Sequence, residues 1–202
     1  AIMVPAATLG IYWVVFDQLG RIGPDDLPYV MFLFPAMLGF DYFRSSVGRA
    51  SGSLKMDAAL LSKIYFPRLL LPLSNVISPL VDFALGSLVL VVILIAFQHA
   101  PSFEILLVPV FLLLAGIAAC GLGMGLSALN AYFRDVQHVL PVMLHLWFFC
   151  SPVLYSVERV PEAYRLLYAI NPLVTVCEGI RFAVLGGETL LTMPMVAISC
   201  GA

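Results

Sequence analysis

Charged residues are scarce in this chain. Lys, Arg, Asp and Glu make up 11% of its 202 residues and leave a formal net charge of −2, whereas about a quarter of a soluble domain is charged. The chain has no basic surface for nucleic acid, which excludes that class of partner. Its hydrophobic residues, 62% of the total, stand in long blocks, a pattern typical of a chain embedded in lipid.

Motifs for chemistry are missing as well. The sequence contains no CxxC or Cys/His cluster, no paired catalytic carboxylates and no nucleophile beside a base. It has no GxxxxGK[ST] loop, so this chain does not cradle ATP phosphates in that way. We therefore predict neither an enzyme nor a metal site. The four cysteines are predicted to be small buried hydrophobic residues: Cys120, Cys150, Cys177 and Cys200.

The apolar blocks predict an all-α polytopic membrane protein, because a helix needs about 20 apolar residues to cross a bilayer. Residues 1–202 then form a single transmembrane domain. Both ends are expected to be truncated, because the sequence begins and ends inside apolar runs. Pro79 lies inside the long third block, where we expect the helix to bend. Six spans are predicted: 2–16, 28–47, 69–97, 105–129, 139–155 and a sixth that begins near 189.

The Lys and Arg residues in short loops predict the orientation. Of the ten basic residues, six lie near the end of the second block or in the loops after the second and fourth blocks, and four lie on the opposite side with most of the acidic residues. Residues 49–68 and the loop "NAYFRDVQ" are therefore predicted to face the cytoplasm. Residues 156–188 are predicted to face outward.

Residues 51–66 read as a short cytoplasmic helix. Ser53 is a candidate N-cap, and Asp57 lies near the start, where the helix dipole favours an anion. Leu54, Ala58, Leu61 and Tyr65 recur at helical spacing. Three interpretations stay open: a surface helix that only joins two spans, a docking element for a cytoplasmic partner, or a basic segment on anionic lipid.

The stretch "NAYFRDVQ" interrupts two apolar blocks with an Arg-Asp pair. A charge at the centre of a bilayer costs about 2.5–3.5 kcal/mol on insertion scales, so Arg134 and Asp135 predict a tight turn outside the hydrocarbon. Asn130 is expected to end one helix and Asp135 to begin the next. The aromatic side chains of Tyr132 and Phe133 suit the headgroup layer.

Residues 156–188 are too polar to span. A first short helix is predicted over 158–169, with Pro161 near its start, and "NP" at Asn171 and Pro172 is expected to end it. A second is predicted over 173–185, ended by Gly186. We interpret these as half-helices that dip into the outer leaflet; an external hairpin without a gating role is the alternative. Glu178 and Arg181 are spaced i,i+3 and are predicted to pair.

Several polar residues fall inside predicted spans, among them Asp41 and Arg44 in the second, spaced i,i+3. Asp82 lies in the third and His145 in the fifth, where polar groups face a bundle interior or a water path. They suit either a proton relay or a structural role. The aromatic residues Trp147, Phe148 and Tyr155 lie in the outer half of the fifth span, where they either pack or stack on a sugar.

Three ordered motifs carry a family resemblance. The stretches "NAYFRDVQHVLP", "FFCSPVLYSVERVP" and "INPLVTVCEGIRFAVLGG" resemble the membrane subunit of type-2 ABC exporters, in the branch that moves O-antigen, capsule and teichoic acid. "LLSKIYFPRLLLPLSNVI" matches the cytoplasmic loop and third span of the same branch. The resemblance implies a homodimer of six-span subunits in the bacterial cytoplasmic membrane, joined to two ATPase subunits that bind ATP and Mg.

Roles for individual residues follow from this resemblance. The ATPase-coupling set is Leu54, Lys55, Asp57, Ala58, Leu61 and Tyr65, and the inner turn is Tyr132, Phe133, Arg134 and Asp135. The external gate is assigned to Pro161, Asn171, Pro172, Glu178 and Arg181. The family motifs do not fix the glycan path, for which aromatic residues are our hypothesis: Tyr42, Phe43, Trp147, Phe148 and Tyr155.

The leading hypothesis is therefore the membrane subunit of an ATP-driven exporter of a lipid-linked polysaccharide. Two alternatives stay open. The same architecture suits a drug or a lipid as cargo. An ion-coupled secondary transporter would instead use Asp82 and His145.

Overall fold

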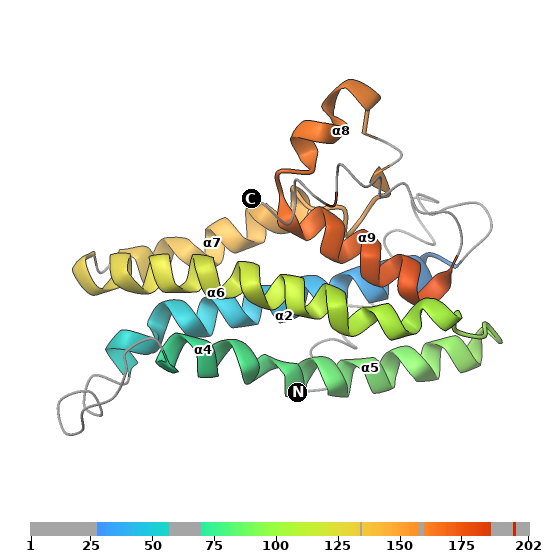
Figure 1. Cartoon of the computed structure of the whole chain (residues 1–202), viewed down its shortest axis with the longest axis horizontal. Coiled ribbons are helices and arrows are strands. Elements are labelled where there is room, and N and C mark those ends of the chain that lie inside the picture. Colours follow the sequence, from blue (N-terminus) through green and yellow to red (C-terminus); the bar gives the residue numbers. More distant parts are fainter. Residues whose placement is uncertain (1–27, 57–69, 134, 158–159, 187–195, 197–202) are drawn as a thin grey trace.

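The computed structural model describes residues 28–56, 70–133, 135–157, 160–186 and 196 (Figure 1). Every regular element within them is a helix and none is a strand. The predicted all-α class is therefore confirmed for the described part of the chain. The first and last predicted spans, 2–16 and the one from 189, lie outside it.

Helix α2, Tyr29–Met56, is the central helix of the bundle. It runs alongside α6, Val108–Tyr132, and also contacts helices on its other sides (Figure 1). Nearly every residue from 29 to 43 is buried. This location explains why that stretch is apolar all round rather than on one face only.

Helix α6 meets α2 through a row of small side chains. A Cβ added at Gly123 would lie 2.6 Å from the Cβ of Ala50 on α2, so the two backbones are nearly in contact. Small residues at an interface permit this approach, which is how membrane helices gain van der Waals contact. The buried residues of α6 recur about once per turn: Ala115, Ala119, Gly123, Ser127 and Asn130.

The third apolar block forms two successive helices. Helix α4 covers Leu70–Ile77 and α5 covers Pro79–Ala96. Ser78 separates them, and Pro79 occupies the first turn of α5, where its missing N–H is tolerated. The structure thus has a one-residue interruption of the helix at the predicted position, and the bend itself stays a prediction.

Within the described residues, two helical stretches are long and apolar enough to cross a membrane. Leu73–Ala96 and Phe103–Tyr132 have mean hydropathies of 2.5 and 2.7, and only 22% and 11% of their most apolar windows is buried inside this chain. The second stretch includes a 3-10 turn, η2, at Phe103–Leu107. Because the core helix of a soluble protein would be mostly buried, these exposed apolar faces suit lipid or another chain.

The C-terminal end of α2 lies further along the chain than predicted. The expected span 28–47 is too short, because α2 continues to Met56. Ser53 is not an N-cap: it lies inside the helix, and its Oγ donates to the carbonyl of Ala50 at 2.8 Å. No proline interrupts this part of α2, and its contact with α6 supports it. Of the coupling residues, Leu54 and Lys55 belong to α2, and the other four, Asp57, Ala58, Leu61 and Tyr65, lie outside the described residues.

Helix α7, Val136–Phe149, is shorter than the predicted span 139–155. The Ser-Pro step at Pro152 explains the early end, because proline cannot continue the backbone ladder. Asp135 precedes α7 as expected, although its side chain makes no cap hydrogen bond. Asn130 does not end α6, which continues to Tyr132. Its Nδ2 instead donates to the carbonyl of Ser51 on α2 at 3.0 Å.

The segment predicted to face outward, called the external segment after that prediction, contains α8, Glu162–Tyr168, and α9, Pro172–Leu185. Helix α8 begins later than the predicted 158–169, because Pro161 is extended, with φ −54° and ψ 139°. The break at Asn171 and Pro172 is confirmed. So is the end at Gly186, whose φ of +68° strains any residue with a side chain.

Candidate functional site

Asn171 joins the external segment to the end of α7. Its Oδ1 caps α9 by accepting from the backbone N–H of Leu173 at 3.1 Å, and it also accepts from the indole Nε1 of Trp147 at 3.1 Å. Its Nδ2 donates to the Oγ of Ser151 at 3.1 Å. One side chain therefore fixes the start of α9 against the last turns of α7.

Arg181 ties three segments together from a side chain that is 7% exposed. Its Nε donates to the carbonyl of Phe32 on α2 at 3.0 Å, and the guanidinium carbon lies 3.7 Å above the Phe32 ring. Its Nη2 donates to the carbonyls of Pro152 and Val153 at 2.9 and 3.1 Å. The planar guanidinium fork suits such divergent acceptors.

The predicted pairing of Glu178 with Arg181 is confirmed. Arg181 Nη1 lies 2.9 Å from Glu178 Oε1, and the glutamate side chain is 17% exposed. The same Oε1 accepts from the backbone N–H of Val157 at 3.1 Å. A buried charge is tolerated only when it is paired and hydrogen-bonded, and both conditions hold here.

Helix α9 is a core element rather than a surface appendage. Ten of its residues are buried, against α2, α6 and η2. A Cβ added at Gly179 would clash with the ring of Phe111 on α6, so a side chain at this position would force the ring to move. If a short helix of this polarity lies at membrane depth, it is tolerated only where protein or a watery cavity surrounds it.

A groove of about 1340 Å³ runs between α6, α7 and the external segment. Its wall is mainly apolar and aromatic, and the predicted path residues Trp147 and Tyr155 line it. The hydroxyl groups of Tyr155 and Tyr168 lie 2.8 Å apart at this wall. Burial, together with this hydrogen bond, raises the pKa of Tyr168 above its ordinary value of 10.0, so the phenol stays neutral.

The other three path residues lie inside the bundle. Tyr42 is 5% exposed and donates to the carbonyl of Val76 at 3.3 Å. Phe43 is fully buried and Phe148 is 7% exposed. The structure thus separates two groove residues from three core residues, and the path role stays a prediction for all five.

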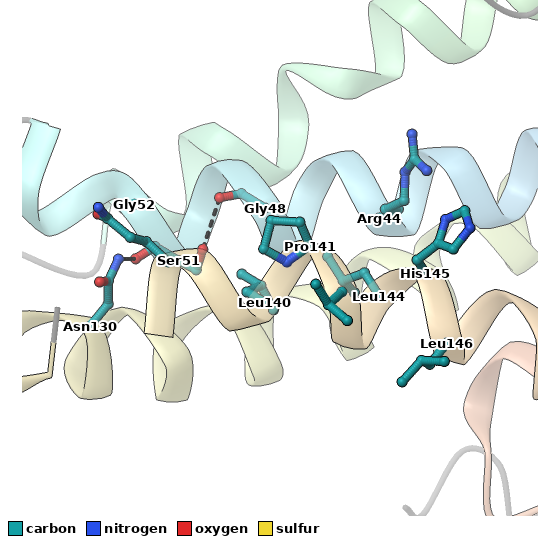
Figure 2. Close-up of a pocket in the computed structure, with 12 residues that line it drawn as sticks. Arg44, Gly48, Ser51, Gly52, Asn130, Leu140, Pro141, Leu144, His145 and Leu146 are labelled. Carbon is teal, nitrogen blue, oxygen red and sulfur yellow. Dashed lines mark hydrogen bonds between the residues drawn. The ribbon is translucent and has the colours of Figure 1, made fainter. Parts of the chain in front are cut away.

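A second cavity, of about 750 Å³, lies between α2 and α7 and reaches the end of α6. Figure 2 shows Arg44 and His145 near one end of it, and Ser51 bonded to Asn130 near the other. Arg44 makes a loose ion pair with Asp41 at 3.8 Å.

The structure does not support a relay between Asp82 and His145. Asp82 pairs with Arg49 on α2, with Nη2 and Oδ2 2.9 Å apart and both side chains about half exposed. His145 instead meets the ring of Phe149 on its own helix. Because α2 is longer than predicted, Arg49 lies on a helix beside Asp82 rather than in a loop.

The inner turn is described in part. Tyr132 ends α6, Phe133 follows in extended conformation, and both side chains are well exposed, as an interfacial position requires. Asp135 precedes α7. Arg134 lies outside the described residues.

Sequence reasoning missed several residues that organise this site. Phe32 and Ser151 look like ordinary apolar and loop residues, and the carbonyls of Pro152 and Val153 have no sequence signature. The one available signal was Arg181 itself, because a lone arginine in an apolar helix requires several acceptors.

The described helices form a helical bundle in which two exposed helical stretches are long and apolar enough to cross a membrane, and in which the ion pair of Glu178 and Arg181 is largely buried. The chain belongs to the ABC-2 type transporter family, whose profile matches residues 1–185.

Similar proteins are named for O-antigen export or for polysialic acid transport. The chain is 32% identical over 173 residues to the O-antigen export system permease protein RfbA of Myxococcus xanthus, covering 85% of this chain and 66% of that protein. It is 29% identical over 167 residues to RfbA of Klebsiella pneumoniae, covering 82% and 63%. It is 26% identical over 192 residues to the polysialic acid transport protein KpsM of Escherichia coli, covering 93% and 73%. The chain thus spans slightly less than two thirds of the O-antigen permeases.

Proposed function

We propose that this chain is the membrane subunit of an ATP-driven exporter that moves a lipid-linked polysaccharide outward across the bacterial cytoplasmic membrane. The observation that carries the proposal is its family membership, together with relatives named for O-antigen and polysialic acid export. These names favour a glycan over a drug or a lipid as cargo. The ion pair of Asp82 with Arg49 removes the main support for an ion-coupled carrier.

The proposed assembly is a homodimer of six-span subunits in contact with membrane lipid. Outward-facing apolar helices support an arrangement in which lipid and a second copy cover these faces. Two cytoplasmic ATPase subunits bind ATP and Mg, because the sequence of this chain has no phosphate-binding loop. Energy then enters through residues 51–66 and the inner turn at 132–135.

The proposed path follows the aromatic wall of the larger groove. Trp147, Tyr155 and Tyr168 line it next to Asn171, which heads the second external helix. Flat aromatic faces suit sugar rings, and the few polar atoms among them suit hydroxyl groups. In this arrangement the external helices, α8 and α9, form the gate at the outer end of the path.

The proposal is tested with the chain and its partner ATPase in proteoliposomes, with a lipid-linked glycan as cargo. ATP-dependent movement of the glycan is the expected result. Export of a small drug or a phospholipid without the glycan would refute the assigned cargo, and transport driven by a proton gradient without the ATPase would refute the mechanism.

The coupling role is tested in the same system. Leu61→Glu, on the predicted apolar face of the cytoplasmic segment, is expected to reduce ATPase co-purification and export together. Lys63→Glu, on the other side of the same predicted helix, is the matched control and is expected to retain both. Equal behaviour of the two variants would refute this docking face.

A further inference from the structure

The Arg181 joint is the set of groups that meet around one guanidinium: Arg181, Glu178, the carbonyls of Phe32, Pro152 and Val153, and the N–H of Val157. Four hydrogen bonds leave Arg181, and they reach α2, α9 itself and the segment that follows α7. A pair needed only to neutralise charge would not require acceptors on three separate segments. The joint connects the external helix to the central helix.

Helix α2 leads from the joint to the cytoplasmic side. It has 28 residues, about 42 Å at 1.5 Å each. Phe32 lies in its first turn. At the opposite end, the last residues of α2, up to Met56, are the first part of the proposed coupling segment, 51–66. A displacement of the cytoplasmic end is therefore carried along α2 to Phe32.

Pro35 is the weak point in α2. It lies inside the helix and has no N–H, so the carbonyl of Met31 loses its intrahelical partner. Helix α9 contacts α2 on both sides of this point. Arg181 holds Phe32 before it, and a Cβ at Gly39 after it would lie 3.3 Å from Cγ1 of Val176. Helix α9 thus bridges the proline.

A second tie supports the same connection. The hydroxyl of Tyr29, in the first turn of α2, donates to the carbonyl of Leu154 at 3.1 Å. Arg181 holds Pro152 and Val153 in the same segment. Two side chains from different helices thus hold 152–154 against the outer end of α2.

We propose that Arg181 is a positioning residue that makes α2, α9 and residues 152–157 move as one body, so that motion at the cytoplasmic end of α2 displaces the external gate. This inference rests on the proposed export function. The gate then opens by movement of α2, α9 and residues 152–157 together, relative to the rest of the protein. It does not open by separation of α9 from α2.

The test is a disulfide between α2 and α9 made with Gly39→Cys and Val176→Cys. The 3.3 Å separation of the Gly39 Cβ position from Val176 Cγ1 suits a bridge, and the atom that must give way, Cδ1 of Ile180 at 2.6 Å, ends a flexible side chain. The double variant is assembled with the ATPase, and export per ATP hydrolysed is compared after oxidation and after reduction. Each single variant, oxidised in the same way, is the control for native thiols.

Retention of at least half of the reduced export after oxidation is expected. A larger loss on oxidation, absent from the single variants, would overturn the proposal, because it would mean that α9 must leave α2. Failure of the bridge to form would overturn it too, since the contact would not exist. Absence of export from the unmodified complex would refute the transport function, whereas a loss confined to the oxidised double variant would refute only the joint.

Rescue tests the role of Arg181 itself. Arg181→Lys keeps the charge but removes the fork, so export per ATP is expected to fall at least fivefold while ATP hydrolysis continues. Adding Gly39→Cys and Val176→Cys and oxidising the pair is expected to restore at least half of the lost export, which a merely structural arginine would not permit. Unchanged export in Arg181→Lys, or no recovery in a folded protein, would contradict the proposal. If the lysine variant does not fold, the bridge in the Arg181 background decides alone.

Discussion

Replacing Asn171 with alanine is expected to destabilise the contact between α7 and α9 by about 2–4 kcal/mol. Loss of the helix cap at Leu173 costs about 1 kcal/mol. The indole N–H of Trp147, partly buried, loses its acceptor at 3.1 Å, and a donor left without a partner costs about 1–3 kcal/mol. Loss of the hydrogen bond from Asn171 Nδ2 to the Ser151 hydroxyl adds less, because a hydroxyl reorients easily.

The assay is reversible unfolding in mixed detergent micelles, followed by circular dichroism. A double-mutant cycle separates the two contributions. With Trp147→Phe already present, Asn171→Ala should cost about 1 kcal/mol less, since no indole remains to lose its acceptor. A loss below about 0.5 kcal/mol in the single variant, or identical losses in both backgrounds, would refute this account of the junction.

Three further predictions concern packing, charge and pH. Gly179→Ala is expected to lower the free energy of unfolding by about 1–3 kcal/mol, because the added Cβ meets an aromatic ring on α6. Gly121→Ala is the control, because a Cβ there has no atom within 4 Å, and it should unfold like the unmodified protein. Equal unfolding midpoints for the two variants would contradict this packing. Asp82→Asn is expected to lower the free energy of unfolding by less than about 1 kcal/mol, since the ion pair of Asp82 with Arg49 is about half exposed. A larger loss that does not depend on salt, measured in the same assay, would show that the pair is shielded from water. The fold raises the pKa of Tyr168, so its contribution to stability is complete below the unfolded pKa near 10 and is lost as the pH rises above that value. Tyr168→Phe should therefore reduce the loss of stability at alkaline pH. An unchanged dependence of the unfolding midpoint on pH would argue against a buried phenol.

Several parts of the site were readable because they depend on local rules. The Asn-Pro step predicted the break between α8 and α9, since the residue before a proline is disfavoured in a helix. Gly186 predicted its end. The spacing of Glu178 and Arg181 predicted their pairing, because residues three apart share one helix face.

Other parts were not readable, because they depend on partners distant in sequence. The length of α2 was misjudged: the sequence predicted a span that ends at 47 and a separate helix capped by Ser53, whereas α2 continues to Met56, where the hydrogen bond from Asn130 to the Ser51 carbonyl supports it. The proton-relay hypothesis failed for the same reason, because Arg49 reaches Asp82 only once α2 extends beyond the predicted boundary.

The sequence by itself determined that this chain is helical and embedded in lipid, because long apolar blocks leave a backbone no other way to satisfy its hydrogen bonds. It also determined the breaks between helices, through proline, glycine and asparagine. Only the tertiary structure decided that α9 lies in the core and that Arg181 connects it to α2 and to residues 152–153. Those acceptors are backbone carbonyls, which every residue carries, so only their arrangement in space distinguishes them.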